Sequence, residues 1–399
     1  MRTSIPVRED FLVFGAPAIE EEEIQEVVAT MRSGWLGTGP KVAVFEHDFR
    51  AYKGAPYAVA VSSCTAGLHL ALLAAGIGPG DEVVTSALTY CATVNAIIHA
   101  GATPVLADVD PRTMNVAPAA VAGRITPRTR ALVPVHFAGR PCDMGALLAI
   151  ARSRNLNVIE DCAHAIETEY QGLKAGTIGD FGCFSFYVTK NVCTGEGGMV
   201  LTRCEQDAAR IRTLAVHGLS RDTWHRFSDD GYKHYSVVEP GFKYNMMDLQ
   251  AAIGIHQLRR LERNWLTRRE IWHQYNEALR DLPVTRPPEP ESDTRHAYHL
   301  YTIRVDEAVA GISRDAFLES MTAQNIGVGV HYLSLPEHPC YQHRFGWNPQ
   351  DYPHAMHIGR CTVSLPLSAK LTDRDVDDVI SAVRRIVPAA QRGAGRSAA

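Results

Sequence analysis

The sequence lacks any apolar run long enough to span a membrane. Its most apolar stretch, residues 68–77 (LHLALLAAGI), is about half of a membrane span and contains a histidine, so we expect a buried helix there. The N-terminal MRTSIPVREDFLVFG has no apolar core of the kind that a secretory signal carries. We therefore expect a cytoplasmic protein with no membrane partner.

Charge of one sign is also scarce. The 40 Lys and Arg residues and the 44 Asp and Glu residues are interspersed, and they give a net charge of −4. Because no basic stripe or tail is present, we expect no nucleic-acid partner. The hydrophobic fraction of 46% and the charged fraction of 21% are those of an ordinary globular protein.

Cysteine motifs are missing although the chain has nine cysteines. They are spread over the whole length without a CxxC pair, and their odd number argues against a closed set of disulfides. We expect each to be a small buried apolar residue. The spacing of His331, His338 and His343 could suggest a metal site, but no cysteine or carboxylate set completes it, so we expect no metal.

Several common catalytic motifs are absent as well. The chain has no GxxxxGK[ST], GxSxG or HExxH, and no GxGxxG follows a predicted strand. P-loop, α/β-hydrolase, zincin and Rossmann assignments therefore lose their usual support. Because this α/β pattern lacks these motifs, we consider a different phosphate-bearing cofactor.

What the sequence does contain is a regular alternation of strand and helix patterns from about residue 55. Short β-branched runs predict strands at residues 57–61, 82–85, 104–107, 131–136 and 156–160. Helical spacing of apolar residues lies between them, at residues 65–75 and 92–100 and from residues 117 and 143 onward. The pattern predicts an α/β fold whose mostly parallel sheet is covered by helices.

The pattern changes after Gly182. We expect strands at residues 183–188 and 199–202, a polar surface excursion at 205–235, and helices from 247 to 279. After the break at residues 287–290 (PPEP) we expect strands at 298–305 and 328–332 and helices at 314–324 and 373–386. These expectations divide the chain into a large domain (1–260), a small C-terminal α+β domain (261–390) and a disordered tail (391–399).

An acid and an amine each follow a predicted strand. Asp161 follows the strand at 156–160, and Lys190 follows the strand at 183–188. Ligands of open α/β sheets bind at such strand ends. Pyridoxal 5′-phosphate (PLP) needs this pair, since a lysine forms the Schiff base and a carboxylate keeps the pyridine nitrogen protonated. Taken singly, a lysine such as Lys190 is more often a solvated loop residue and an aspartate such as Asp161 a helix N-cap, so the prediction rests on the two together.

Motifs along nearly the whole chain resemble those of the DegT/StrS-type sugar aminotransferases, a branch of the aspartate-aminotransferase (type I) PLP fold. In order these motifs are SGWLGTGPKVAVFE, AVAVSSCTAGLHLAL, DEVVTSALTYCATVNAI, VIEDCAHA, FSFYVTKNVCTGEGGMV, HGLSRD, GFKYNMMDLQAAIG, HAYHLY and VSLPL. The resemblance implies a seven-stranded, mostly parallel sheet in a large PLP-binding domain. It also implies transamination through pyridoxamine 5′-phosphate.

The resemblance assigns cofactor contacts to eight residues. Lys190 matches the Schiff-base lysine and Asp161 the pyridinium partner. His164 matches a position near the phenolic oxygen, and Tyr90 matches an aromatic that stacks on the ring. The residues that match phosphate contacts are Ser185, Thr65, Cys64 and Asn245. Relatives commonly have glycine where Cys64 stands, so only its backbone N–H is expected to contribute, at a helix N-terminus.

Partners and substrates follow from the same resemblance. Asn245 matches an asparagine that reaches the phosphate of a neighbouring subunit, which implies a homodimer with shared active sites. Residues in motifs that line the substrate cleft are Trp35, His217, Lys243 and His331. L-glutamate is the expected amino donor, and the acceptor is a nucleotide-linked keto sugar. The stretch GVGVHYLSLPEHPCY favours amination at C4 of a 4-keto-6-deoxyhexose.

Other functions remain open at this point. A C3 keto sugar or a cyclitol could be the acceptor. PLP-dependent sugar dehydratases of the same fold have histidine in place of the Schiff-base lysine, so Lys190 disfavours that activity. A non-enzymatic regulator with this fold could lose Lys190 or Asp161 without penalty, and both are present.

Overall fold

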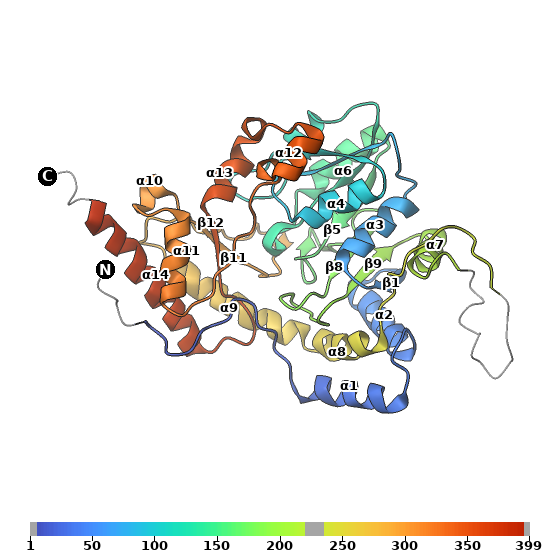
Figure 1. The fold of residues 1–399 in the computed structure, drawn as a ribbon, viewed down its shortest axis with the longest axis horizontal. Coiled ribbons are helices and arrows are strands. Elements are labelled where there is room, and N and C mark those ends of the chain that lie inside the picture. The colour runs from blue at the N-terminus through green and yellow to red at the C-terminus, as the bar shows by residue number, and fades with distance from the viewer. Residues whose placement is uncertain (1–5, 220–234, 395–399) are drawn as a thin grey trace.

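The computed structural model describes residues 6–219 and 235–394. A seven-stranded sheet forms the centre of the larger part (Figure 1), in the order β1-β9-β8-β5-β4-β2-β3. Its strands are β1 Tyr57–Val61, β2 Glu82–Ser86, β3 Thr103–Ala107, β4 Thr129–Val133, β5 Asn157–Asp161, β8 Phe181–Ser185 and β9 Gly198–Thr202. Only β9 runs antiparallel to its neighbours, because β1 and β8 both pair with it in that sense. The expected α/β fold with a mostly parallel sheet is confirmed.

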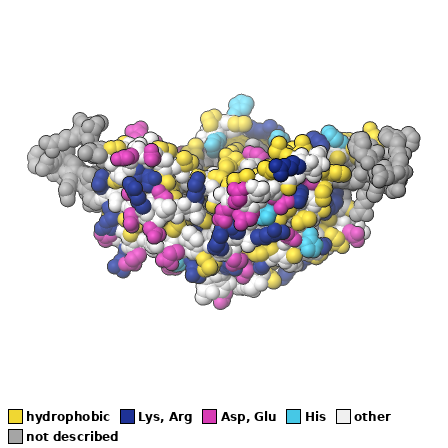
Figure 2. Space-filling view, turned by 90° about the horizontal axis from the view of Figure 1, so that it is seen from below, with side chains coloured by type: hydrophobic (Ala, Val, Ile, Leu, Met, Phe, Trp, Pro, Cys, Tyr) yellow, Lys and Arg dark blue, Asp and Glu magenta, His cyan; other side chains and the backbone are white. Residues whose placement is uncertain are grey.

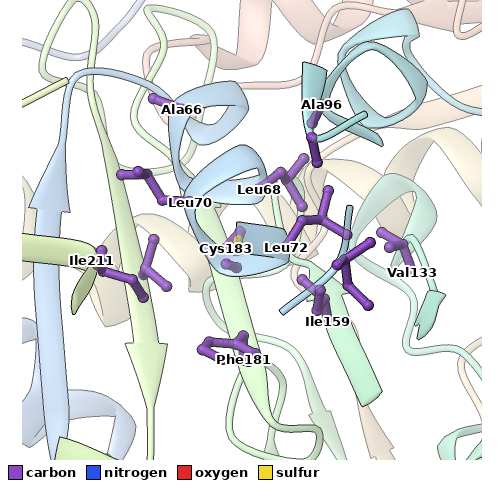
Figure 3. Packing of buried hydrophobic residues seen from close by; sticks show 14 of the residues in the cluster. Ala66, Leu68, Leu70, Leu72, Ala96, Val133, Ile159, Phe181, Cys183 and Ile211 are labelled. Atoms are coloured by element: carbon purple, nitrogen blue, oxygen red, sulfur yellow. The ribbon is translucent and has the colours of Figure 1, made fainter. Parts of the chain in front are cut away.

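Helices cover both faces of this sheet, as the apolar strands require. The helices of the larger part are α1 Glu21–Ser33, α2 Pro40–Lys53, α3 Cys64–Ala74, α4 Cys91–His99, α5 Pro118–Ala122, α6 Met144–Arg154, α7 Glu205–Ala215 and α8 Asp248–Arg259. On one face, α3 places Leu68 and Leu72 against Ile159, Phe181 and Cys183 of the central strands (Figure 3). On the other face, the buried aromatic rings are those of Phe45, Phe49, Phe184 and Phe186.

The C-terminal part has its own core around a two-stranded sheet, β11 Tyr301–Arg304 and β12 Thr362–Leu365. Its longer helices are α9 Leu261–Ala278, α11 Arg314–Ala323 and α14 Asp373–Ala394 (Figure 1, left). Trp272, Tyr275 and Tyr301 are fully buried in this core. Each large ring removes a large apolar area from water, which stabilises the core.

The structure also has shorter elements. They are α10 Glu307–Ala310, α12 Pro339–Phe345, α13 Pro353–Cys361, β6 Glu169–Tyr170, β7 Leu173–Lys174 and β10 Thr294–Arg295. Figure 1 shows α12 beside α4, and the Tyr341 hydroxyl donates a 2.7 Å hydrogen bond to Asn95 Oδ1 of α4. Residues 335–358 are therefore packed against the larger part, close to the carboxyl end of β2, where the Leu335 N–H donates to the Ala87 carbonyl.

The structure departs from several sequence-based expectations. Residues 328–332 form no strand, because their pairing is limited to a single bridge between Gly329 and Ser364. The range 205–235 begins with helix α7, and its residues 220–234 lie outside the described residues. Helix α14 continues to Ala394, four residues into the range expected to be a tail, and residues 395–399 lie outside the described residues. Helices α1 and α2 had no counterpart in the sequence analysis.

Two further features are the distribution of charge on the surface and the apolar character of the helices. Figure 2 shows basic and acidic side chains interspersed over the face that it views. Within residues 6–219 and 235–394, no helix is both long enough and apolar enough to cross a bilayer.

Candidate active site

Asp161 is the last residue of β5 and is almost fully buried. Its Oδ2 accepts a 2.8 Å hydrogen bond from the Thr93 hydroxyl, and its Oδ1 accepts one of 3.1 Å from the Ala163 N–H. Burial raises the pKa of Asp161, while the Thr93 and Ala163 hydrogen bonds and the charge of Lys190 oppose that rise. A cation or a protonated nitrogen placed beside this carboxylate would keep it ionised.

Lys190 lies in the turn that follows β8, where its backbone N–H donates to the Tyr187 carbonyl at 2.8 Å. Burial lowers the pKa of Lys190 to about 8, against the opposing charges of Cys64 and Asp161. A lysine with a lowered pKa is partly unprotonated near neutral pH, and the free amine is the nucleophilic form. The two strand ends thus place an acid and a reactive amine within electrostatic reach of each other.

The N-terminus of α3 lies beside this pair. The Ser63 side chain caps the helix by accepting from the Ala66 N–H at 3.1 Å, and Cys64 and Thr65 form the first turn. Gly198 of β9 presses against this turn, since a Cβ there would lie 2.5 Å from the Ser63 carbonyl carbon. Ser185 pairs with Gly198, so its buried position on β8 is next to the same turn.

His164 extends the site toward the C-terminal part. Its Nδ1 accepts from the Ala138 N–H at 3.2 Å, and its Nε2 lies 2.9 Å from the Tyr332 hydroxyl oxygen. Its ring also lies 4.4 Å from that of His299. Burial, with Lys190 next in importance, lowers the pKa of His164 well below its usual value. The imidazole is therefore neutral.

A buried polar chain holds the residue that follows Lys190. Asn191 Oδ1 lies 3.0 Å from His299 Nδ1, and Asn191 Nδ2 donates to Glu167 Oε2 at 2.8 Å. Glu167 also forms a buried ion pair with Arg268 of α9. Because each member is hydrogen-bonded, the chain fixes the turn that carries Lys190.

The rings of Tyr90 and His331 both lie beside that of Tyr332. The Tyr90 side chain is 58% exposed, and its ring centre is 5.7 Å from that of Tyr332. His331 Nδ1 lies 2.8 Å from the Ser364 hydroxyl, and the His331 ring stacks on Phe14. Burial, followed by the charge of Lys190, lowers the pKa of His331 to about 3. His331 is therefore neutral and held by Ser364 of β12.

Four residues to which the resemblance assigns roles lie apart from Asp161 and Lys190: Trp35, Asn245, His217 and Lys243. Trp35 is 53% exposed and lines an open hollow of about 400 Å³ together with Asn245. Asn245 Nδ2 donates to the Thr38 hydroxyl at 2.7 Å, and the Asn245 backbone pairs with Val61 at the edge of β1.

The other two, His217 and Lys243, are exposed and lie on neighbouring backbone segments. The His217 N–H donates to the Phe242 carbonyl at 2.7 Å, and Val216 pairs with Lys243. Among the described residues of this chain, neither side chain forms a hydrogen bond or ion pair with Asp161, Lys190 or their immediate neighbours.

One cluster among the described residues has the composition of a metal site: His136, Glu160 and Cys162, all buried. Glu160 accepts from three backbone N–H groups of residues 176–179 at 2.7–2.9 Å and lies 3.0 Å from His136 Nε2. His136 Nδ1 accepts from the Cys142 N–H at 3.0 Å. Burial would raise the pKa of Glu160, but these hydrogen bonds lower it. The ligand atoms of His136 and Glu160 are thus already used to hold the chain together.

The side chains fit PLP by their chemistry. A buried carboxylate suits a pyridinium nitrogen, an amine of lowered pKa suits an aldehyde, and a capped helix N-terminus suits a phosphate. Sequence reasoning missed Tyr332, His299 and Thr93. Each of these had a signal, because Tyr332 follows His331, His299 lies within the HAYHLY motif and Thr93 lies within the DEVVTSALTYCATVNAI motif.

Comparisons with known proteins agree with this geometry. The model of the DegT/DnrJ/EryC1/StrS aminotransferase family matches residues 17–384. The spore coat polysaccharide biosynthesis protein SpsC of Bacillus subtilis is 51% identical over 96% of this chain and 99% of its own.

Solved structures are similar as well. Spr1654 of Streptococcus pneumoniae in its PMP form has a TM-score of 0.89 and 31% identity, over 96% of this chain and 100% of that one; a PLP form has also been solved. DesI in the presence of its TDP-sugar product has a TM-score of 0.85 and 31% identity, over 98% of this chain and 95% of that one. The chain belongs to the DegT/DnrJ/EryC1/StrS aminotransferase family, the PLP-dependent sugar aminotransferases.

Proposed function

We propose that this sugar aminotransferase takes the amino group of L-glutamate and transfers it to a nucleotide-linked keto sugar, at C4 of a 4-keto-6-deoxyhexose. The observation that carries the proposal is the buried carboxylate of Asp161 within electrostatic reach of the amine of Lys190, whose pKa is lowered to about 8. The similarity to DesI, solved in the presence of its TDP-sugar product, supports a nucleotide-linked acceptor.

In this proposal Asp161 and Lys190 carry the chemistry. PLP, when bound, supplies the electron sink for the bond changes at the amine-bearing carbon. Asp161 holds a proton on the pyridine nitrogen, and Thr93 and the Ala163 N–H orient its two oxygens. Lys190 Nζ attaches the cofactor and, once freed, accepts and returns the proton that the transfer requires.

Other side chains bind and orient. The N–H groups of Cys64 and Thr65 at the start of α3, with the hydroxyls of Thr65 and Ser185, hold the phosphate. The Tyr90 ring packs on the pyridine. His331, held by Ser364, faces the sugar and excludes water from the small-domain side.

The exposed residues are explained by a homodimer with shared sites. The hollow lined by Trp35 and Asn245 lies away from Lys190 in its own chain. In the proposed dimer, Asn245 of the partner subunit reaches the phosphate, while Trp35, His217 and Lys243 border the cleft for the sugar nucleotide. Each site would then be incomplete in a monomer.

A substrate screen tests the acceptor. The purified holoenzyme is incubated with L-glutamate and a panel of keto-sugar nucleotides that differ at C3 and C4, together with keto cyclitols. Mass spectrometry then detects the replacement of the ketone by an amine. We expect the 4-keto-6-deoxyhexose to be converted fastest. Preferential conversion of a 3-keto sugar or of a cyclitol would overturn the C4 assignment.

A further inference from the structure

A second open hollow lies between helix α9 and residues 290–298, and none of its walls belongs to the site around Asp161 and Lys190. We call it the α9 hollow. Its volume is about 570 Å³, which is within the range of pockets that bind small molecules. Its polar and aromatic walls include Trp265, Arg269, Glu270, Arg295, His296 and Tyr298. The proposed amino transfer uses none of these residues.

Arg269 has no acidic partner in the part of the chain that the structure describes. Its guanidinium carbon lies 5.0 Å from the centre of the Trp265 ring, and within residues 6–219 and 235–394 its side chain forms no hydrogen bond or ion pair. The Arg295 guanidinium lies over the same ring at 4.1 Å, but it is ion-paired with Glu262. Because a guanidinium has five N–H donors and no acceptor, Arg269 brings an unused set of donors and a positive charge to the hollow.

His296 brings a second donor. It is 3% exposed, and its Nδ1 accepts from the Tyr298 N–H at 2.8 Å, so Nδ1 carries no proton. Burial, with the charge of Arg140 next in importance, lowers the pKa of His296 well below its usual value, and the neutral ring therefore has its proton on Nε2. Among the described residues nothing accepts from Nε2, which keeps some contact with solvent. Since His296 lines the hollow and is otherwise enclosed, this N–H is directed into it.

Tyr298 brings a third donor. It is 5% exposed, lines the same hollow, and has its ring centre 4.9 Å from that of His296. Its hydroxyl forms no hydrogen bond to any residue that the structure describes. Its φ of +48° lies in the left-handed region, which a bulky residue rarely adopts. Two nearly enclosed side chains, His296 and Tyr298, thus have unused donors beside the unpaired Arg269.

We propose that the α9 hollow binds the phosphate group of a small organic molecule through Arg269, His296 and Tyr298. All three offer donors, so the ligand must supply acceptors, and the charge of Arg269 favours an anion. Donors on three separate residues suit a phosphate, which presents three free oxygens, better than a planar carboxylate, which presents two. The hollow is much larger than a phosphate, so the organic part of the ligand also has room.

One charged group of the walls opposes an anion. Glu270 is the single carboxylate among the described walls. Because an α-helix turns by about 100° per residue, Glu270 borders the hollow at a different side of α9 from Arg269. His273, also in the walls, lies 3.7 Å from Glu289 and is less available to a ligand than Arg269. Removing the Glu270 charge should therefore strengthen the binding of an anion.

Isothermal titration calorimetry of the holoenzyme, in a buffer free of phosphate and sulfate, tests the site. PLP already fills its own phosphate site in the holoenzyme. The probes are glucose 6-phosphate, inorganic phosphate and acetate. We expect glucose 6-phosphate to bind more tightly than inorganic phosphate, and acetate not to bind. Binding of acetate as tight as that of phosphate would overturn the choice of a phosphate. Equal affinities for the two phosphates would overturn the organic ligand.

Variants of the walls show whether the bound phosphate is in this hollow. Arg269→Gln should weaken the binding of glucose 6-phosphate by about tenfold or more, because hydrogen bonds to a charged donor are lost, and Tyr298→Phe should weaken it about threefold. Glu270→Gln should tighten it. Arg263→Gln is the matched control, since Arg263 is on the same helix but pairs with Glu20, and we expect no change. If Arg269→Gln and Tyr298→Phe both bind as tightly as wild type, the proposal is wrong.

Thermal unfolding separates a lost donor from a damaged fold. Without ligand, Arg269→Gln should unfold at nearly the wild-type temperature, and Arg269→Lys, which keeps the charge, should recover part of the affinity. Glucose 6-phosphate should raise the unfolding temperature of wild type, because it binds only the folded protein, and should raise that of Arg269→Gln less. An equal rise in both proteins would contradict the site. Neither experiment uses glutamate or a keto sugar, so both can succeed even when the acceptor proposal fails.

Discussion

Two groups of proposed site residues differ in their surroundings. The first group is Asp161, His164 and Lys190, and the second group is Trp35 and Asn245. Asp161 and His164 are buried, and neighbours in the same chain bind to their polar atoms. Trp35 is 53% exposed and borders an open hollow with Asn245. A role for the first group can be argued from its contacts within one chain, whereas a role for the second group depends on what covers the hollow.

The largest effect is expected from removing the amine of Lys190, the reactive group beside Asp161. Lys190→Ala should abolish turnover, because no other side chain supplies the attachment point. In the wild-type protein, borohydride should fix the chromophore to the peptide that contains Lys190. Lys53 is an internal comparison: its pKa is also lowered to about 8 by burial, but its Nζ donates to the Ile166 carbonyl at 2.8 Å. A reduced adduct on Lys53 or any other lysine would refute the assignment.

The second group is tested by complementation between chains. Asn245→Ala and Lys190→Ala protomers should each be inactive or impaired alone, and mixing them should restore part of the activity. In a shared-site dimer, one of the two hybrid sites has both Lys190 and Asn245. The readout is turnover after subunit exchange, with sedimentation to record the oligomeric state. A fully active monomer would show that the second group is not needed at the site of a partner subunit.

Asp161→Asn should lower the rate of the glutamate half-reaction by about ten- to a hundredfold. The substitution removes one charge-assisted hydrogen bond, about 1.5–3 kcal/mol, and weakens protonation of the pyridine. The measurement is stopped-flow absorbance at saturating PLP. Glu160→Gln is the matched control: Glu160 binds His136 and the 176–179 backbone, so we expect it to lower stability more than rate. Near wild-type speed in a folded, PLP-loaded Asp161→Asn protein would exclude Asp161 as the pyridinium partner.

The smallest expected effect is the dependence on pH of the rate at which Lys190 captures PLP. Only the unprotonated amine attacks the aldehyde, and burial lowers the pKa of Lys190 to about 8. The rate at which apoenzyme captures PLP should therefore rise with pH and level off above about 8, falling about tenfold per pH unit below that value. Absorbance after mixing apoenzyme with PLP measures it. A profile that continues to rise toward the ordinary lysine pKa would show that Lys190 is not buried as described.

The sequence supported the first group better than the rest of the site because its strongest signals are local. Asp161 and Lys190 each follow a strand that β-branched and aromatic residues make predictable. Tyr332 and His299 reach the same place from the C-terminal part, through packing that no local pattern encodes. Residues 328–332 have strand-like composition, yet tertiary contacts hold them beside His164 instead. Helix α1 has apolar residues at helical spacing, Ile24, Val27, Val28 and Met31, so its absence from the sequence-based expectations was an omission. It packs on α8 through buried polar contacts of Glu23 with Gln257 and Arg260.

The pairing of β1 has a consequence for how the chain is made. Tyr57–Val61 leaves the ribosome early, but its two partners, Gly198–Thr202 and Asn245, are synthesised much later. Until then an apolar strand has unpaired edges, which favours association with other nascent chains. Such distant pairings also slow folding. We expect fragments that end before Gly198 to aggregate, and the newly made enzyme to depend on chaperones during that interval.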